Sequence, residues 1–209
     1  MKIIISGLTA AGKTTHGRLL AQTWDLPYYS MVRVMGDVLA HDWPALPTGR
    51  WTPDRDLIRR DRPDVDLLAD ERMVRLAETT PTGVFDAWAL PWLYDRDDAV
   101  RLWLESDLPS RIRKYQVSQL PLLPDEAAVR QLLEAKDGFA RARFGKLYGF
   151  DLYTDRGPFE LIADNSGYLP VATADAARTG VAAFHRELLR LFETPAPPPR
   201  RPDPSRSQG

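Results

Sequence analysis

The segment Gly7–Thr15 constrains this chain most, because its sequence GLTAAGKTT fits the pattern G-x-x-x-x-G-K-[ST]. The run before it, Lys2–Ser6, is short and β-branched, which predicts a buried parallel strand. After the segment, Leu19, Leu20 and Trp24 recur close to helical spacing. A strand, a glycine-bearing loop and a helix in this order are the context in which such a loop binds phosphate groups.

Each part of the loop has a physical role in holding a nucleotide. Gly7 and Gly12 allow backbone angles that a β-carbon resists, so successive N–H groups can turn inward. The following helix adds the positive end of its dipole. We expect Lys13 to contact the β- and γ-phosphates and Thr14 to offer its hydroxyl to Mg²⁺. The sequence thus predicts ATP and Mg²⁺ as cofactors, with the nucleotide held by Gly7, Thr9, Ala10, Ala11, Gly12, Lys13, Thr14 and Thr15.

Composition restricts the possible partners. The chain has 209 residues and a formal net charge of −1, so no global basic field recruits nucleic acid or an anionic membrane. It contains no cysteine, which removes disulfides and thiolate metal sites. No segment approaches the roughly 20 apolar residues that span a bilayer. We therefore expect a cytoplasmic protein, monomeric or homodimeric, with a small-molecule substrate and no nucleic-acid or membrane partner.

The remaining chain alternates strand-like and helix-like runs. We expect strands at 26–30, 83–86, 100–104 and 159–164, and helices at 31–41, 65–78 and 181–192. This alternation predicts an α/β P-loop NTPase fold, a three-layer sandwich with a central parallel sheet and helices on both faces. A single P-loop domain is expected at 1–193, with a helical Arg-rich lid at about 107–148. The Pro- and Arg-rich tail at 194–209 is expected to be disordered.

GTPases, ATPases and small-molecule kinases all have such a loop, and two features favour a kinase. The chain is small, and basic residues crowd into one stretch well after the loop. Phosphoryl transfer needs charge neutralisation and exclusion of water, which a closing cationic lid provides. A solvated helical face is an equally ordinary explanation for these residues: Arg111, Arg113, Lys114, Lys136, Arg141 and Arg143.

Two other classes stay open. One is a regulator or slow NTPase that uses nucleotide as a switch, although the chain has no Asn-Lys-x-Asp-like segment for reading guanine. The other is a degenerate kinase retained as a binding module, against which the intact Lys13-Thr14 pair argues.

From Met1 to about Phe192 the chain resembles the cytidylate kinase group of nucleoside monophosphate kinases, particularly its shorter archaeal-type members. The resemblance is carried by the strand and loop at 2–15, by 26–30, by the helix at 65–77 and by 161–166, which is similar to a signature ending in Asp-Thr-Ser. It implies a monophosphate-kinase-like fold. In the lid it places Arg111 and Lys114 where an arginine pair is expected, and it assigns a second basic cluster to Lys136, Asp137 and Arg143.

The chain departs from this family on the acceptor side. After Ser30 the family has Gly-Asp and then an arginine that touches the acceptor phosphate, which is displaced or absent here. After the third strand the family has an acidic residue and then Gly-Arg, whereas here Asp86 is followed by Ala87 and Trp88. Trp88 can stack on a base or sugar ring. Asp86 can act as general base or hold Mg²⁺ through water.

These observations predict an ATP-dependent phosphotransferase that transfers the γ-phosphate to a nucleotide or nucleoside-like acceptor. The alternative acceptor is a hydroxyl group on a specialised metabolite. If the acceptor is a monophosphate, Trp88 belongs to the core and one of Arg33, Arg59, Arg60 or Arg62 binds its phosphate.

The predicted site residues fall into four sets. The catalytic set is Lys13, Asp86, Arg111 and Arg143, and Lys114 joins the loop in binding the nucleotide. The acceptor-binding set is Ser30, Arg33, Asp70, Trp88, Lys136 and Asp137. The metal-binding set is Thr14 and Asp86.

Overall fold

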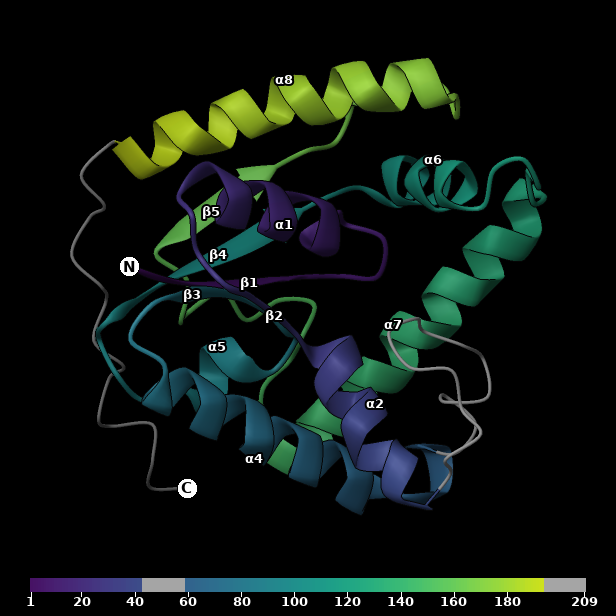
Figure 1. The fold of residues 1–209 in the computed structure, drawn as a ribbon. Coiled ribbons are helices and arrows are strands. Elements are labelled where there is room, and N and C mark those ends of the chain that lie inside the picture. Colours follow the sequence, from purple (N-terminus) through teal and green to yellow (C-terminus); the bar gives the residue numbers. More distant parts are fainter. Residues whose placement is uncertain (43–58, 194–209) are drawn as a thin grey trace.

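The computed structural model describes residues 1–42 and 59–193, so the predicted tail at 194–209 lies outside the described residues. Five parallel strands form one sheet in the order β2-β3-β1-β4-β5 (Figure 1). Their bounds are β1 (Lys2–Gly7), β2 (Tyr28–Ser30), β3 (Gly83–Asp86), β4 (Ala99–Glu105) and β5 (Leu161–Asp164). This sheet confirms the predicted α/β fold.

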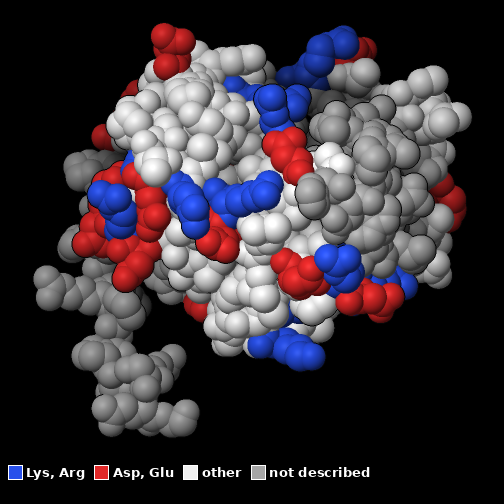
Figure 2. Space-filling view, turned by 60° about the horizontal axis from the view of Figure 1, so that its bottom comes forward, with Lys and Arg blue, Asp and Glu red and all other residues white. Residues whose placement is uncertain are grey.

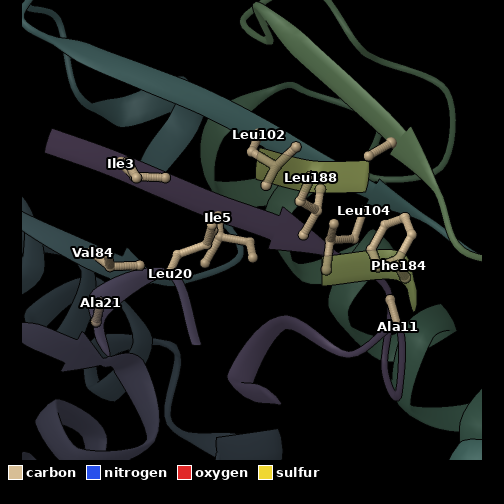
Figure 3. Close-up of a cluster of buried hydrophobic side chains, with 11 residues drawn as sticks. Ile3, Ile5, Ala11, Leu20, Ala21, Val84, Leu102, Leu104, Phe184 and Leu188 are labelled. Carbon is tan, nitrogen blue, oxygen red and sulfur yellow. The ribbon is translucent and has the colours of Figure 1, made fainter. Parts of the chain in front are cut away.

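One face of the sheet is covered by α1 (Lys13–Thr23) and α8 (Ala174–Glu193). Side chains of a strand alternate between faces, so Ile3 and Ile5 of β1 point to this side. There they pack with Leu20 of α1 and with Phe184 and Leu188 of α8 (Figure 3). All five side chains are at most 1% exposed, and they form the core behind the phosphate loop.

The other face is covered by α4 (Pro63–Thr79) and the short α5 (Leu90–Leu93). Ile4 and Phe85 point to this side and pack against Met73 of α4. The helix α2 (Met31–Asp42) packs on α4 through Met35 and Leu39. The two helices and the sheet therefore frame the space beyond the ends of β1 and β3.

The predicted lid stretch contains α6 (Leu108–Ser118) and α7 (Glu126–Tyr148), which lie to one side of the sheet (Figure 1). They pack together through Ile112, Val129 and Leu133, and Ala10 of the phosphate loop contacts this cluster. Because α6 ends at Ser118 and α7 begins at Glu126, the two helices lie on either side of Pro121 and Pro124. Whether they close as a lid stays a prediction.

Several boundaries differ from the sequence prediction, and the largest difference is at the closing helix. The closing helix α8 begins at Ala174 rather than at 181, because Gly180 lies within the helix instead of ending it. A Cβ at Gly180 would lie 1.9 Å from the carbonyl oxygen of Tyr168, so this glycine permits a close backbone approach. The strand β5 begins at Leu161 rather than at 159. None of the described helices is both long and apolar enough to cross a membrane.

Candidate active site

The phosphate loop joins the end of β1 to the first turn of α1, in the order that the sequence predicts. Gly7 has φ 149°, and a Cβ there would lie 2.7 Å from the carbonyl oxygen of Leu104. Gly12 has φ 97° and immediately precedes α1. Ala10 also has a left-handed backbone, with φ 61°. Left-handed residues within such a turn help to form the concave run of N–H groups that binds anions.

Lys13 is bonded to its own loop. Its Nζ donates to the carbonyl oxygens of Gly7 at 2.7 Å and Leu8 at 2.9 Å. The ammonium also lies 5.3 Å from the centre of the Trp88 ring. Burial lowers the pKa of Lys13 to about 8, and the nearby carboxylate of Asp86 partly offsets this. Lys13 therefore remains mainly charged at pH 7 and can exchange its carbonyl partners for phosphate oxygens.

Asp86 lies beside the loop because β3 pairs with β1, with Asp86 opposite Ile5. This pairing places the end of β3 beside the phosphate loop. The Oδ2 of Asp86 accepts hydrogen bonds from the hydroxyls of Thr14 and Tyr28, each at 2.7 Å. Burial, together with the charge of Asp86, raises the pKa of Tyr28, so the phenol remains a donor.

The Thr14 hydroxyl and the Asp86 carboxylate are the hard oxygen ligands that Mg²⁺ prefers. Among the residues that the structure describes, no group of three or more His, Cys, Asp or Glu side chains could hold a metal ion. A divalent cation at this pair would therefore take its other ligands from phosphate and water, as is common for Mg²⁺.

A cavity of about 210 Å³ opens beside the loop. Thr9, Ala10, Lys13 and Thr14 line it on the loop side. Across from them lie apolar side chains from α2, α7 and the segment after β3, namely Met31, Met35, Trp88, Phe139 and Phe144. The charged lining residues are Lys13, Arg59, Lys136, Asp66, Asp70 and Asp86. The cavity thus joins the phosphate loop to a mixed apolar and charged compartment.

Two carboxylates one turn apart on α4 line this compartment. Asp66 is 2% exposed, and its Oδ1 lies 2.6 Å from Arg59 Nη2, while its Oδ2 lies 3.4 Å from Arg143 Nη1. Asp70 is 6% exposed and accepts a hydrogen bond from the Tyr148 hydroxyl at 2.8 Å. It has no ion pair with any described residue. Burial raises the pKa of Asp70 to about 7, and the charge of Asp66 adds to this shift.

Lys114 and Asp137, two of the predicted site residues, support the loop from outside the cavity. Asp137 accepts hydrogen bonds from the N–H and the hydroxyl of Thr9. Lys114 donates to the Ser106 hydroxyl at 2.8 Å and to the side-chain oxygen of Asn165. The amide of Asn165 in turn donates to the carbonyl oxygen of Ala11 at 2.7 Å.

The structure brings part of the predicted acceptor set together and leaves the rest elsewhere. Asp70, Trp88 and Lys136 line the cavity. Ser30 does not, and its hydroxyl accepts from the N–H of Val32 at the start of α2. Arg33 is exposed on α2. Their roles stay predictions.

The predicted catalytic arginines also lie outside the cavity lining. Arg143 donates to the carbonyl oxygens of Arg59 at 2.7 Å and Arg60 at 2.9 Å. Arg111 bonds to Asp137 and to the carbonyl oxygen of Thr9. Thr15 is exposed on α1. These placements leave the assigned functions as predictions.

Phe139, which lines the cavity, and Tyr28, which donates to Asp86, were not predicted, although two patterns point to them. Phe139 follows Lys136 by three residues and precedes Arg143 by four, so helical spacing places all three on one side of α7. Tyr28 precedes Ser30 by two residues on β2, and Ser30 pairs with Asp86. Strand alternation therefore brings Tyr28 to the Asp86 side of the sheet. Met31 and Met35 have the spacing of core residues on a helix, so nothing in the sequence indicated that they line the cavity.

The loop, the strand order and the carboxylate at the end of β3 define the fold of a P-loop kinase, a class of phosphotransferase. In sequence, the chain is 22% identical to the cytidylate kinase of Methanosarcina mazei over 185 residues, which cover 88% of this chain and 98% of that enzyme. The chain is a distant homologue of cytidylate kinases and is itself a phosphotransferase, as its sequence predicts. No protein-family model matches the chain.

The fold is also similar to solved structures. Shikimate kinase from Bacteroides thetaiotaomicron has a TM-score of 0.58 and 15% identity, over 93% of this chain and 99% of that chain. An uncharacterized protein from Eubacterium ventriosum has a TM-score of 0.62 and 11% identity, with the same coverage. At these identities the likeness concerns the fold alone.

Proposed function

We propose that this chain transfers the γ-phosphate of ATP to a hydroxyl group of a small-molecule acceptor bound in the cavity beside the phosphate loop. The observation that carries this proposal is the shared lining of the cavity. Lys13 and Thr14 line it together with Asp86, and so do the side chains of α2, α4 and α7. A phosphate in the loop and an acceptor in the cavity would therefore lie next to one another.

The donor side is expected to bind ATP through the loop N–H groups and Lys13. The neighbouring Thr14 hydroxyl and Asp86 carboxylate would hold Mg²⁺, Thr14 directly and Asp86 through water. When bound, the ion neutralises charge on the phosphates. Lys13 would add a second positive charge where negative charge builds up in the transition state.

The charge balance of the cavity favours an acceptor without a phosphate group. Its described lining carries three cationic and three acidic side chains. Arg59 is already paired with Asp66 at 2.6 Å. A phosphomonoester dianion needs cations in excess, both to bind it and to offset its repulsion from ATP. Acidic and basic side chains also lie next to one another on the molecular surface around α4 (Figure 2).

The other lining residues suit a ring-bearing acceptor with hydrogen-bond donors. Trp88, Phe139 and Phe144 offer aromatic surface for stacking or edge contacts. Asp70 uses its Oδ2 for Tyr148 and has no second hydrogen bond among the described residues. Its other oxygen is suited to accept from a hydroxyl or amino group of the acceptor. A nucleoside-like compound has both features.

Asp86 is the candidate general base. Its Oδ2 is occupied by Thr14 and Tyr28, and its Oδ1 forms no hydrogen bond with described residues. In the proposed reaction the acceptor oxygen forms a bond to the γ-phosphorus, and its proton passes to Asp86. The bond from that phosphorus to the β,γ-bridging oxygen breaks, and ADP leaves.

A nucleoside monophosphate is the second candidate acceptor. It is favoured by the sequence relatives, which are cytidylate kinases. In that case Lys136, which lines the cavity, would be expected to contact the acceptor phosphate.

The test is coupled ATP consumption with Mg²⁺ and matched pairs of acceptors, such as cytidine with CMP and uridine with UMP, plus non-nucleoside alcohols. The proposal expects a higher kcat/KM for the member of each pair without phosphate. Higher kcat/KM for CMP, dCMP or UMP would replace it with the second candidate. If ATP neither binds nor turns over with any acceptor, the phosphotransfer proposal itself is wrong.

A further inference from the structure

Asp137 lies on α7 beside the phosphate loop and is 1% exposed. Its Oδ1 accepts hydrogen bonds from the N–H of Thr9 at 2.9 Å and from the Thr9 hydroxyl at 2.6 Å. Its Oδ2 accepts one from Nη1 of Arg111, on α6, at 2.5 Å. The same Nη1 donates to the carbonyl oxygen of Thr9 at 3.1 Å. A closed ring of hydrogen bonds thus joins α6, α7 and the loop.

This ring of hydrogen bonds is buried, so breaking one of the bonds would destabilise the folded chain. Arg111 is 7% exposed, and its ion pair with Asp137 is shielded from water. Removing one partner of a buried ion pair leaves an uncompensated charge, which is strongly destabilising. Hydrogen bonds between charged partners are also stronger than neutral ones. The guanidinium of Arg111 is therefore held in one place relative to Thr9.

One end of this guanidinium is left for another ligand. Nη2 of Arg111 forms no hydrogen bond with any residue that the structure describes. The pair also lies within electrostatic range of Lys13. Burial lowers the pKa of Lys13, while the charge of Asp137 raises it and that of Arg111 lowers it further. A phosphate bound at Lys13 would experience the same two charges.

We propose that Asp137 is a positioning residue that fixes Arg111 against the phosphate loop, so that the free end of the guanidinium meets the phosphates of a bound nucleotide. The inference rests on the proposed function, since it assumes ATP in the loop. It gives Asp137 a role on the nucleotide side, because this side chain does not line the acceptor cavity. Asp137 then acts through Arg111 and Thr9 and not by contact with either substrate.

A double-mutant cycle on nucleotide affinity tests this role without requiring a known acceptor. The probe is a non-hydrolysable ATP analogue with Mg²⁺, titrated calorimetrically into the full chain. Arg111→Ala removes the cation, and Asp137→Asn removes its anionic partner while keeping an oxygen for Thr9. Each change is expected to lower affinity about tenfold, the scale of one charge-assisted hydrogen bond. The loss of nucleotide affinity in the double variant should be at most about twice the larger of the two single losses, because both changes remove the same interaction.

Two further variants separate positioning from folding. Thr9→Val removes only the hydroxyl of the ring and should lower affinity several-fold, even if Asp137→Asn fails to fold. Asp175→Asn is the matched control, since it breaks an exposed pair with Arg178 on α8 and should leave affinity unchanged.

If the two single losses of affinity multiply to about a hundredfold in the double variant, this inference is wrong and the proposed function is unaffected. The same conclusion follows if Asp137→Asn binds the analogue with wild-type affinity. Wild-type affinity in Thr9→Val would overturn it as well. No binding to the wild-type chain would overturn the proposed function and this inference together.

Discussion

The hydroxyl of Thr14 donates to Oδ2 of Asp86 across 2.7 Å, which joins the first turn of α1 to the end of β3. The loop residue and the carboxylate are 72 positions apart in the sequence. Parallel pairing of β1 with β3 brings them together, and this edge of an open α/β sheet is where ligands bind. The relationship makes Asp86 the residue whose substitution is most informative.

Asp86→Asn is expected to lower kcat by about 10²–10³-fold, because an amide neither takes up the acceptor proton nor carries the charge that attracts Mg²⁺. Steady-state rates over a series of Mg²⁺ concentrations measure both effects. Tyr28→Phe is the control, since it removes one hydrogen bond to the same oxygen but leaves the carboxylate and its charge in place, so it should lower kcat less than Asp86→Asn does. Turnover of Asp86→Asn within a few-fold of wild type would exclude the general-base role.

Trp88 is expected to determine which acceptor is used. Trp88→Ala should raise the acceptor KM about tenfold with a smaller change in kcat, because it removes aromatic surface from the cavity. Trp88→Arg adds a cation at the same position and should shift the ratio of kcat/KM for CMP to that for cytidine toward CMP. An unchanged ratio would mean that Trp88 belongs only to the surrounding packing, where it contacts Phe144 edge-on.

The buried carboxyl group of Asp70 is expected to lower the free energy of unfolding of the chain at neutral pH. Burial raises its pKa from an ordinary 3.8 to about 7, so between these pH values the folded chain binds more protons than the unfolded chain. The stability of the wild type therefore falls as pH rises through this range. Asp70→Asn has no such titration and still accepts from Tyr148.

The stability advantage of Asp70→Asn should consequently grow from about pH 4 to about pH 7, reach a few kcal/mol and level off above that. Chemical denaturation at several pH values measures it. An advantage that does not change with pH would show that Asp70 is ionised throughout and is stabilised by another group.

The sequence predicted the part of the site that is local along the chain. The loop at Gly7–Thr15 carries its geometry in consecutive residues, and the runs of β-branched residues predicted the sheet. Asp86 was also predictable, because a carboxylate that ends a parallel strand next to β1 must face the loop. Helix α8 was placed seven residues late, since Gly180 resembles a helix end until the close approach of Tyr168 is known.

The acceptor side depends on contacts between distant segments, which explains why less of it was predicted. Nothing in the local sequence shows that Asp66 is paired with Arg59 or that Tyr148 reaches Asp70 from α7. Asp137, which was predicted to bind the acceptor, forms hydrogen bonds with Thr9 and Arg111, and the local sequence does not show these partners either. These pairings arise from the packing of α4, α6 and α7 around the loop.

The most direct test of the central claim is ADP release from MgATP, with the best acceptor found, by the wild type and by Lys13→Ala. Lys13→Ala should fold normally and lose at least about 10²–10³-fold in turnover, because the charge on the β- and γ-phosphates is gone. Lys146→Ala, at the exposed end of α7, should match the wild type. Near-normal turnover by Lys13→Ala would contradict phosphate transfer at this loop.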